Sequence, residues 1–408
     1  MNDDLLALAS TEDERKFATE AVEFLAGATT RRPTAEVSWG AGEEGLALFH
    51  ETTDVQERAE ADAARAWQRK RWDAGFGWLT GPREHGGRGL PVAFDRLYRR
   101  IEAEFVVPDM GALRIGLGWV SPTIVRYGSD EQLTRYAGGL HRGALTACAL
   151  LSEPDAGSDL ASVRTRGERD GTGWRLTGQK IWTSNGRFAG IGLALIRTDP
   201  TAPKHRGLTT FLVPMKQPGV EVRPIRQLTG GTSFCEVFLD GAQVPDSLRL
   251  GEEGNGWRVA TSALANERRD ASDRSHDLLA RAQRLLGILA DRAGRADDPL
   301  VRDSLAQLYI RLRVARLHQL RTQATASQPI TQTSGTIDKL LVAANLREIG
   351  ELAAELLGPA FAADTGEWGT FGWTKWMLGA LGYRIAGGTE EVLKTMLAER
   401  VLGLPREG

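Results

Sequence analysis

The sequence contains few of the residues that build disulfide frameworks or metal sites. Cysteine occurs only at Cys148 and Cys235, both inside apolar, strand-like runs, which favours buried free thiols over a disulfide. The 6 histidines are scattered along the chain, and no metal-ligand spacing links them. We therefore expect neither a disulfide-stabilised secreted domain nor a metal centre.

Long apolar runs and an excess of charge are also absent. No run of about 18 apolar residues occurs, so we predict no membrane span. The net charge of −2 gives no reason to expect nucleic acid or an anionic membrane as a partner. Residues 1–14 are acidic and lack the basic start and apolar centre of a signal peptide, which makes a cytoplasmic location the default expectation.

What the sequence does contain is an ordinary globular composition with three zones of different periodicity. Hydrophobic residues make up 41% and charged residues 25% of the 408 positions, which predicts roughly two or three domains. Helical spacing dominates the first and last zones, and a period of two marks the middle zone. We expect an α+β multidomain chain with an N-terminal helical domain (1–140), a middle β-barrel or sandwich (141–248) and a C-terminal four-helix bundle (249–408).

The C-terminal zone contains four long helical patterns, which antiparallel packing would combine into a bundle. They cover residues 257–295, 299–323, 335–358 and 387–403. The three long patterns have apolar stripes that leave more apolar face than one small bundle needs, which predicts an assembly of several chains; examples are Leu340, Leu341, Ala344 and Leu352. The second pattern contains scattered arginines that we assign to a solvated or subunit-facing surface: Arg302, Arg311, Arg313, Arg316 and Arg321.

The stretch from Leu151 to Asn185 organises the middle zone. A strand-like run, GALTACALL, precedes it and is expected to end in a turn whose hydroxyls and backbone N–H groups can bind a ligand. The run WRLTGQKIW alternates like a strand and ends in the small polar residues TSN. Two such polar turns suit a ligand that is part flat ring and part hydrogen-bonding chain. The residues by themselves leave a ligand site and two ordinary turns equally open.

Three motifs resemble the acyl-CoA dehydrogenase family: SEPDAGSDL at 152–160, KIWTSNG at 180–186 and GGTEEVLKTMLAERVLGLP at 387–405. They stand in the family's order, and the likeness runs from about Glu14 to Pro405. The resemblance implies the order α-domain, β-domain, α-domain and a tetramer built on the C-terminal bundle. It also implies FAD as cofactor, an acyl thioester as substrate and electron-transfer flavoprotein or a similar acceptor as partner.

The resemblance also implies a set of FAD-binding residues. Leu151, Ser152 and Ser158 would hydrogen-bond the flavin and pyrophosphate, and Gly157 belongs to the same turn. Trp182 would stack near the isoalloxazine ring, and the Ser184 hydroxyl would bond its edge. At the start of the last helix, Gly388, Thr389 and Glu391 would meet the FAD, since a helix N-terminus favours an anionic pyrophosphate.

The family reaction removes a proton from the α-carbon of the thioester and a hydride from the β-carbon, giving a trans-2-enoyl thioester. The commoner base precedes the Gly-Thr pair before the last helix, where this chain has Gly387. A second family position follows the pattern Leu-x-x-Glu-Arg, which LeuAlaAsnGluArg matches with Glu267. The alternative is a surface Glu267 paired to Arg268 or Arg269. The backbone N–H of Gly387 can still bond the thioester carbonyl.

One departure from the family concerns the segment between the first two bundle helices. Many members have Arg-x-x-Phe-Gly there, contacting the FAD of a neighbouring subunit, whereas this chain has ArgAlaGlyArgAlaAspAspProLeu. Arg292 or Arg295 would serve in place of the missing motif. The departure keeps a second hypothesis open, an FAD-poor partner subunit of a mixed tetramer. A third hypothesis is an oxidase or monooxygenase on the same fold. Intact Ser158, Trp182 and Thr389 favour a chain that binds FAD itself.

Overall fold

A computed structural model describes residues 3–33, 46, 48, 53–324, 334–364 and 370–405, and every predicted site residue lies within these ranges. The chain divides into two compact units. The first unit consists of Met1–Ala35, Thr52–Ile225 and Phe234–Ala263; the second consists of Glu36–Glu51, Arg226–Ser233 and Leu264–Gly408. The division into domains 1–140, 141–248 and 249–408 stays a prediction.

The N-terminal helices of the first unit share a core of their own. They are α1 (Asp3–Leu6), α2 (Glu12–Ala28), α3 (Asp54–Asp73) and α4 (Val92–Glu102). Thr11 and Glu14 form a capping box that starts α2, because each side chain accepts the backbone N–H of the other. Helical spacing places Phe17, Ala21 and Leu25 on the buried face of α2, as the sequence predicts.

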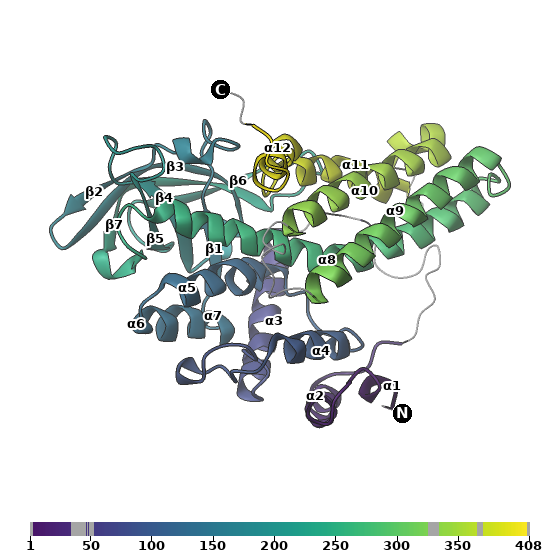
Figure 1. The fold of residues 1–408 in the computed structure, drawn as a ribbon, viewed down its shortest axis with the longest axis horizontal. Coiled ribbons are helices and arrows are strands. Elements are labelled where there is room, and N and C mark those ends of the chain that lie inside the picture. Colours follow the sequence, from purple (N-terminus) through teal and green to yellow (C-terminus); the bar gives the residue numbers. More distant parts are fainter. Residues whose placement is uncertain are drawn as a thin grey trace. The chain divides into compact units, whose positions relative to one another are not determined.

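A second group of short helices packs against the sheet of the first unit (Figure 1). The group comprises α5 (Ser121–Tyr127), α6 (Asp130–Gln132) and α7 (Gly138–His141), with π-helical turns at Gly116–Val120 and Leu133–Ala137. Ser129 caps α6 by accepting the N–H of Gln132 at 3.3 Å. Ile124 and Tyr136 from these helices share one hydrophobic core with Leu193 of the sheet.

The strands of the first unit form one sheet in the order β6-β7-β3-β2-β4-β5-β8, with β1 paired to β4 in parallel. Both faces of β4 and β5 are buried, which explains why their sequences read as nearly continuous apolar runs. Cys148 and Cys235 are buried free thiols within this sheet, as predicted. The strands are β1 (Ala147–Leu150), β2 (Arg166–Asp170), β3 (Gly173–Ser184), β4 (Ile191–Arg197), β5 (Leu208–Pro214), β6 (Val220–Ile225), β7 (Phe234–Pro245) and β8 (Arg249–Leu250).

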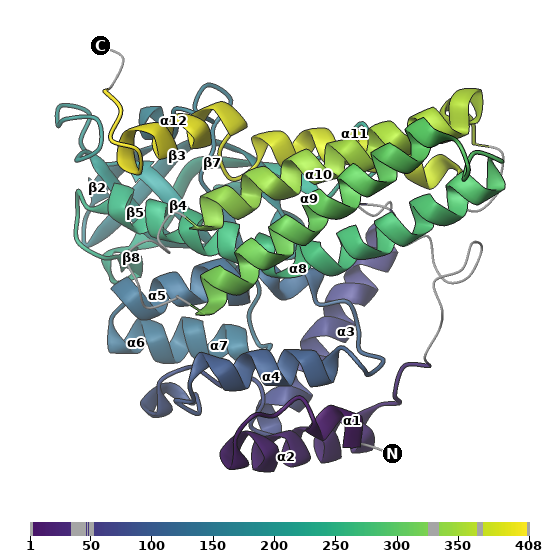
Figure 2. The same ribbon diagram turned by 45° about the vertical axis from the view of Figure 1, so that its right-hand side comes forward.

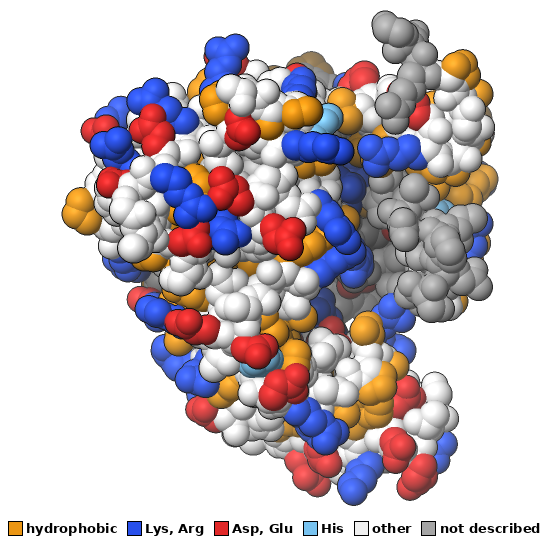
Figure 3. Space-filling model, turned by 60° about the vertical axis from the view of Figure 1, so that its left-hand side comes forward, with side chains coloured by type: hydrophobic (Ala, Val, Ile, Leu, Met, Phe, Trp, Pro, Cys, Tyr) orange, Lys and Arg blue, Asp and Glu red, His pale blue; other side chains and the backbone are white. Residues whose placement is uncertain are grey.

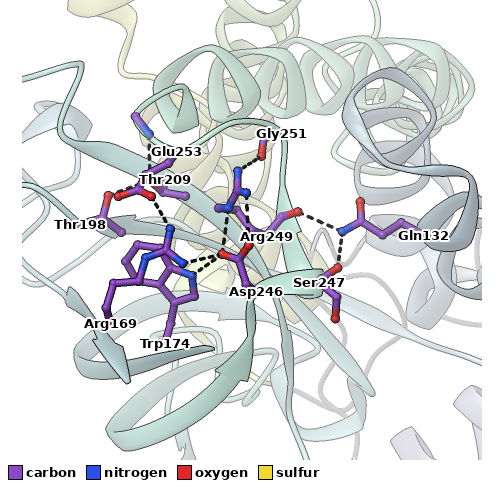
Figure 4. Close-up of polar contacts among 11 residues, drawn as sticks. Gln132, Arg169, Trp174, Thr198, Thr209, Asp246, Ser247, Arg249, Gly251 and Glu253 are labelled. Atoms are coloured by element: carbon purple, nitrogen blue, oxygen red, sulfur yellow. Dashed lines mark hydrogen bonds and ion pairs between the residues drawn. The ribbon is translucent and has the colours of Figure 1, made fainter. Parts of the chain in front are cut away.

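A polar network around Asp246 fastens the sheet to its neighbours (Figure 4). The Asp246 carboxylate accepts hydrogen bonds from Trp174 Nε1 at 2.7 Å and Arg249 Nε at 3.1 Å. The Arg169 guanidinium lies 4.0 Å from the Trp174 ring centroid and bonds Asp246 at 3.2 Å. Gln132 of α6 donates to the carbonyl of Arg249 at 3.0 Å. The network therefore links three strands to the helical layer through charge-assisted hydrogen bonds.

The second unit is a bundle of long helices (Figure 2). Four helices contribute to its core, with Leu285 from α8, Leu308 from α9, Ile349 from α10 and Trp376 from α11. The helices are α8 (Gly256–Arg292, of which residues 256–263 belong to the first unit), α9 (Pro299–Ala324), α10 (Ser334–Leu357), α11 (Thr370–Ile385) and α12 (Glu390–Arg400).

Helix α11 is the part of the bundle that the sequence analysis did not assign. Its sequence, TFGWTKWMLGALGYRI, contains three glycines and has apolar residues on all sides, so no amphipathic stripe marks it. Trp373 and Trp376 are fully buried against α10. The fourth core helix is therefore α11, and the last predicted pattern, α12, follows it.

An exposed apolar face of the bundle lies on α9, one of the three helices predicted to have excess apolar surface. On α10, Leu352 is buried in the core of the unit, whereas Leu340, Leu341 and Ala344 are partly exposed. Ile310, Val314 and Leu317 of α9 are 54%, 52% and 54% exposed, and they recur at helical spacing. This face is opposite to the buried face of α9, which contains Leu308, Leu312 and Ala315.

Acidic and basic side chains both occur on the face drawn in Figure 3. In the part of the chain that the structure describes, no helix combines the length and the apolar character needed to cross a membrane. Among the same residues, no cluster of His, Cys, Asp and Glu could hold a metal ion.

Candidate active site

The segment after β1 forms a tight turn with an exposed tip. Glu153 and Ala156 exchange backbone hydrogen bonds of 3.1 Å and 3.0 Å, which close the turn over Pro154 and Asp155. Gly157 and Ser158 follow on the exposed side. The Ser158 hydroxyl therefore lies on the surface of the first unit, where it is accessible to a ligand.

A buried ion pair anchors this turn to β3. Lys180 is fully buried, and its Nζ lies 2.7 Å from Glu153 Oε1. The same Nζ donates to the carbonyls of Leu151 at 3.1 Å and Leu195 at 2.6 Å. All three donor sites of the ammonium group are thus used, so the backbone of the turn is held from beneath.

The charges of this pair are set by burial and by each other. Burial lowers the pKa of Lys180 to about 8, against the opposing effect of Glu153. Burial alone would raise the pKa of the Glu153 carboxyl, but the Lys180 ammonium and the backbone N–H of Arg164, which donates at 2.6 Å, lower it. Both groups are charged at neutral pH. Each charge stabilises the other in place of the water that burial removes.

Trp182 leaves the sheet at a bulge in β3. The pairing of β3 with β7 shifts register between Lys180 and Thr183, and Trp182 has a φ of 61° within that interval. Bulges re-aim side chains, and a positive φ is costly for a bulky residue. The indole is 58% exposed and meets Phe234 edge-on at 6.2 Å. The strained backbone therefore presents a large aromatic ring to a ligand.

The two segments of the predicted flavin site meet in the first unit. The N–H of Ile181 donates to the carbonyl of Ser152 at 2.9 Å, so the 151–158 turn lies beside the strand end that presents Trp182. Ser184 closes the same strand end opposite Phe234. An exposed ring with hydroxyls on either side fits FAD, which needs a stacking surface for its isoalloxazine and donors for its polar edge.

The second unit contains the turn between α11 and α12. Gly387 and Gly388 have φ values of 68° and 102°, which favour glycine. Thr389 is the N-cap of α12, because its hydroxyl oxygen accepts the N–H of Val392 at 3.2 Å. The N–H of Glu391 and the Thr389 hydroxyl lower the pKa of the exposed Glu391 carboxyl.

Glu267 of α8 lies beside Gly387. A methyl group placed on the Cα of Gly387 would lie 3.4 Å from Glu267 Oε1. Arg268 NH1 donates to the carbonyl of Gly387 at 3.3 Å, and Arg269 NH2 donates to Asn266 Oδ1 at 3.2 Å. Burial lowers the pKa of Arg268, and Glu267 opposes this. The two predicted catalytic positions are therefore adjacent within the second unit.

Arg292 and Arg295 lie away from that turn. Arg292 is about 25 residues after Glu267, which corresponds to roughly 38 Å along α8. Arg295 bonds Asp298 Oδ2 at 2.7 Å and Glu355 Oε1 at 3.0 Å, so its guanidinium is engaged within its own chain. The structure does not bring these arginines to the Gly387 turn of the same chain.

Two family models match the chain: the acyl-CoA dehydrogenase middle domain over residues 148–242 and the acyl-CoA dehydrogenase C-terminal domain over residues 254–402. Acyl-CoA dehydrogenase IpdE1 of Mycobacterium tuberculosis is 38% identical over 359 residues, covering 86% of this chain and 91% of the relative. The chain belongs to the acyl-CoA dehydrogenase family. Members of this family are oxidoreductases that act on CH–CH groups.

Further acyl-CoA dehydrogenases support the assignment. FadE34 of Mycobacterium tuberculosis is 40% identical over 324 residues, covering 78% of this chain and 44% of the relative. The solved Tcur3481-Tcur3483 steroid ACAD is 25% identical with a TM-score of 0.74, covering 98% of this chain and 100% of the other. The ChsE4-ChsE5 complex from Mycobacterium tuberculosis is 24% identical with a TM-score of 0.73, covering 98% and 99%. These structures confirm the predicted fold class.

The acyl-CoA dehydrogenase motifs did not point to the residues that hold the two turns. Lys180 lies inside the motif KIWTSNG, but its role requires Glu153, which is 27 residues earlier. Lys339 of α10 donates to the carbonyls of Gly388 at 2.7 Å and Arg384 at 3.2 Å. One signal could have found both: each lysine interrupts an otherwise apolar or strand-like run, at a position that the period of the element buries.

A basic cavity of about 650 Å³ lies in the first unit between β2 and the loop after β4. Arg164, Arg166, Arg197 and Lys204 line it. Arg197 is fixed there by bonds to the carbonyls of Ala161 at 2.6 Å and Lys204 at 2.8 Å. Several cations in one cavity favour an anionic ligand.

Proposed function

We propose that this chain catalyses the FAD-dependent α,β-dehydrogenation of an acyl thioester, with Glu267 as the base that takes the α-proton. The observation that supports the proposal most directly is the position of Glu267 Oε1, 3.4 Å from where a side chain at Gly387 would begin. Gly387 occupies the position of the commoner family base. A carboxylate from α8 therefore reaches the place from which that base acts.

Two groups of the second unit would act on the substrate, the Gly387 N–H and the Glu267 carboxylate. The Gly387 N–H donates to the thioester carbonyl oxygen, which stabilises the negative charge that develops there and makes the α-proton more acidic. Glu267 accepts that proton on a carboxylate oxygen, as a general base. When bound, FAD supplies the acceptor for the β-hydride.

Each unit contains residues proposed to contact the cofactor. In the first unit, Leu151, Ser152, Gly157 and Ser158 would bind it through the turn, with Trp182 and Ser184 at the strand end. In the second unit, Gly388, Thr389 and Glu391 would meet it at the start of α12. Arg292 and Arg295 would contact the FAD of a neighbouring chain, since each lies far from the Gly387 turn of its own chain.

The carrier of the acyl group is proposed to be coenzyme A rather than an acyl carrier protein. The basic cavity beside β2 supports this choice, because its arginines and Lys204 suit the phosphates of a nucleotide. Lys204 also bonds Asp159 Oδ2 at 2.5 Å, next to Ser158 of the flavin turn. The cavity and the cofactor turn are therefore neighbours in the same unit.

The exposed face of α9 supports assembly with another chain of the same family. Ile310, Val314 and Leu317 form an apolar stripe that a monomer would leave in water. Two structural neighbours are named as pairs of different chains, so the partner is either a second copy or a related chain. Light scattering of the protein, purified alone and after co-expression with a related chain, would report a tetramer in one of these preparations.

Anaerobic bleaching of the purified yellow protein tests the proposed reaction. A panel of straight-chain, branched and polycyclic acyl-CoA thioesters should contain one that bleaches the flavin. Polycyclic thioesters are included because one structural neighbour is named a steroid ACAD. Glu267→Gln should slow bleaching by about 10²–10⁴-fold, because an amide cannot accept the proton. Flavin content should be unchanged, and bound thioester should still perturb the flavin spectrum.

The matched control is Glu351→Gln, which removes a 55% exposed carboxylate from α10 and should leave the bleaching rate unchanged. Near-normal bleaching by Glu267→Gln would place the base elsewhere. Protein that takes up no FAD in any preparation would instead support the partner-subunit hypothesis. Rapid reoxidation of the bleached protein in air would identify an oxidase on the same fold.

A further inference from the structure

Lys339 lies beneath the turn that separates α11 from α12. The residue is 9% exposed, and its Nζ donates to the carbonyl of Gly388 at 2.7 Å. It also donates at 3.2 Å to the carbonyl of Arg384, in the last turn of α11. Carbonyls at a helix C-terminus lack intrahelical partners, and a cation there is favoured by the helix dipole. Lys339 therefore ends α11 and fixes the start of the turn.

A second cation holds the same turn from another helix. Arg268 of α8 donates to the carbonyl of Gly387, the residue next to the one that Lys339 binds. Two consecutive carbonyls are thus bound from α8 and α10. Because the carbonyl of one residue and the N–H of the next residue share one peptide plane, these bonds fix the direction of the N–H groups of Gly388 and Thr389.

The charges around Lys339 include the proposed base. Burial lowers the pKa of Lys339, while the carboxylates of Glu390, Glu267 and Glu391 raise it and Arg268 lowers it further. Glu390 is also paired with Arg384 of α11 at 3.1 Å. An electrostatic interaction between two groups acts on both, so the Lys339 ammonium favours the charged form of Glu267.

We propose that Lys339 is a positioning residue for the reaction assigned above: it holds the Gly387–Gly388 turn in place and keeps the Glu267 carboxylate in its charged, proton-accepting form. The inference rests on the proposed function, but it concerns a different residue and a different effect. Charge and hydrogen bonding contribute separately. The charge sets the pH at which Glu267 becomes a base, and the hydrogen bonds set how well the turn binds the thioester.

Three substitutions separate the two contributions. Lys339→Gln removes the charge and keeps a donor, Lys339→Met removes both, and Lys339→Arg keeps the charge. The first readout is the infrared titration of the Glu267 carboxyl, obtained as the difference from Glu267→Gln, which does not depend on turnover. The second readout is the pH profile of bleaching at saturating thioester, together with the thioester concentration at half-maximal rate.

The charge predicts that both pH midpoints rise in Lys339→Gln and Lys339→Met, and stay near the parent value in Lys339→Arg. The lost donors predict weaker thioester binding in Lys339→Met than in Lys339→Gln. Lys394→Gln is the control, because it removes the same charge from a 66% exposed side chain on α12 and should shift neither midpoint.

An unmoved infrared midpoint in folded Lys339→Gln would overturn the inference. If that variant does not fold, Lys339→Met, which keeps the length of the side chain, is read in the same way. The proposed function fails differently. If Glu267 is not the base, the infrared midpoint still moves with the charge at Lys339, whereas the bleaching profile does not follow it.

Discussion

The two units of this protein hold their ligand-facing turns with the same device, a buried lysine whose ammonium group binds backbone carbonyls. In the first unit, Lys180 binds the carbonyl of Leu151 beneath the turn predicted to bind the flavin. In the second unit, Lys339 binds the carbonyl of Gly388 beneath the turn that faces Glu267. Both turns are short and polar, and neither has a regular element of its own to hold it.

The two lysines differ in how their charge is compensated. Lys180 is fully buried and lies 2.7 Å from Glu153, so one buried carboxylate directly compensates its charge; we call this a closed pair. Lys339 bonds two carbonyls, and the carboxylates that face it come from two other helices. A closed pair makes a rigid support, because breaking it leaves a buried charge. The charge of Lys339 instead acts on several neighbouring carboxylates, including that of the proposed base, Glu267.

The largest effect is expected from breaking the closed pair. Lys180→Met should lower the free energy of unfolding by about 3–5 kcal/mol, because Glu153 would keep a buried charge without its partner. Lys204→Met is the matched control, since it breaks a pair in which the lysine is 47% exposed, and should cost about 1 kcal/mol or less. Urea unfolding followed by circular dichroism measures both.

A double variant sharpens this test. Adding Glu153→Gln to Lys180→Met removes the uncompensated charge, so part of the lost stability should return. If the double variant is as unstable as the sum of the two single variants, the pair does not act as a unit. Flavin content should fall with Lys180→Met at temperatures where the protein is still folded, since the turn loses its support.

A smaller effect is expected from the glycines of the two turns. Gly388→Ala should cost about 1–3 kcal/mol, because φ is 102° and the new methyl would lie 3.1 Å from Leu393 Cδ2. Gly157→Ala should change stability by no more than about 0.5 kcal/mol, because its methyl would meet no atom within 4 Å. Thermal unfolding compares the two variants, and equal losses would mean that the strain at Gly388 is not specific.

The smallest effect concerns the two hydroxyls predicted to bind FAD. Thr389→Ala should cost about 1 kcal/mol, because it removes the N-cap of α12, whereas Thr389→Ser keeps the cap. Ser158→Ala should leave stability within about 0.5 kcal/mol, since Ser158 is exposed. Both alanine variants should bind FAD more weakly. Ser158→Ala with unchanged flavin affinity would remove the hydroxyl from the site.

Much of the fold could be predicted because its signals are local. The strands are short apolar or alternating runs with turn residues between them, and α8, α9 and α10 follow long helical patterns. Helix α11 was not predicted, because Trp373 and Trp376 are packed in a helix that is apolar on every side. Which face of α9 is exposed could not be predicted, because both faces of that helix are apolar and periodicity does not tell which one is buried.

By itself, the sequence determined the family, since its motifs lie within short segments, and it predicted the cofactor turns and the two candidate catalytic positions. Only the tertiary structure decided that Glu267 lies beside Gly387, and that Lys180 and Lys339 support the turns. Lys339 and Gly388 are 49 residues apart, on different helices. Contacts across such distances depend on how the helices pack, because the period of one helix does not specify which residues of another it meets.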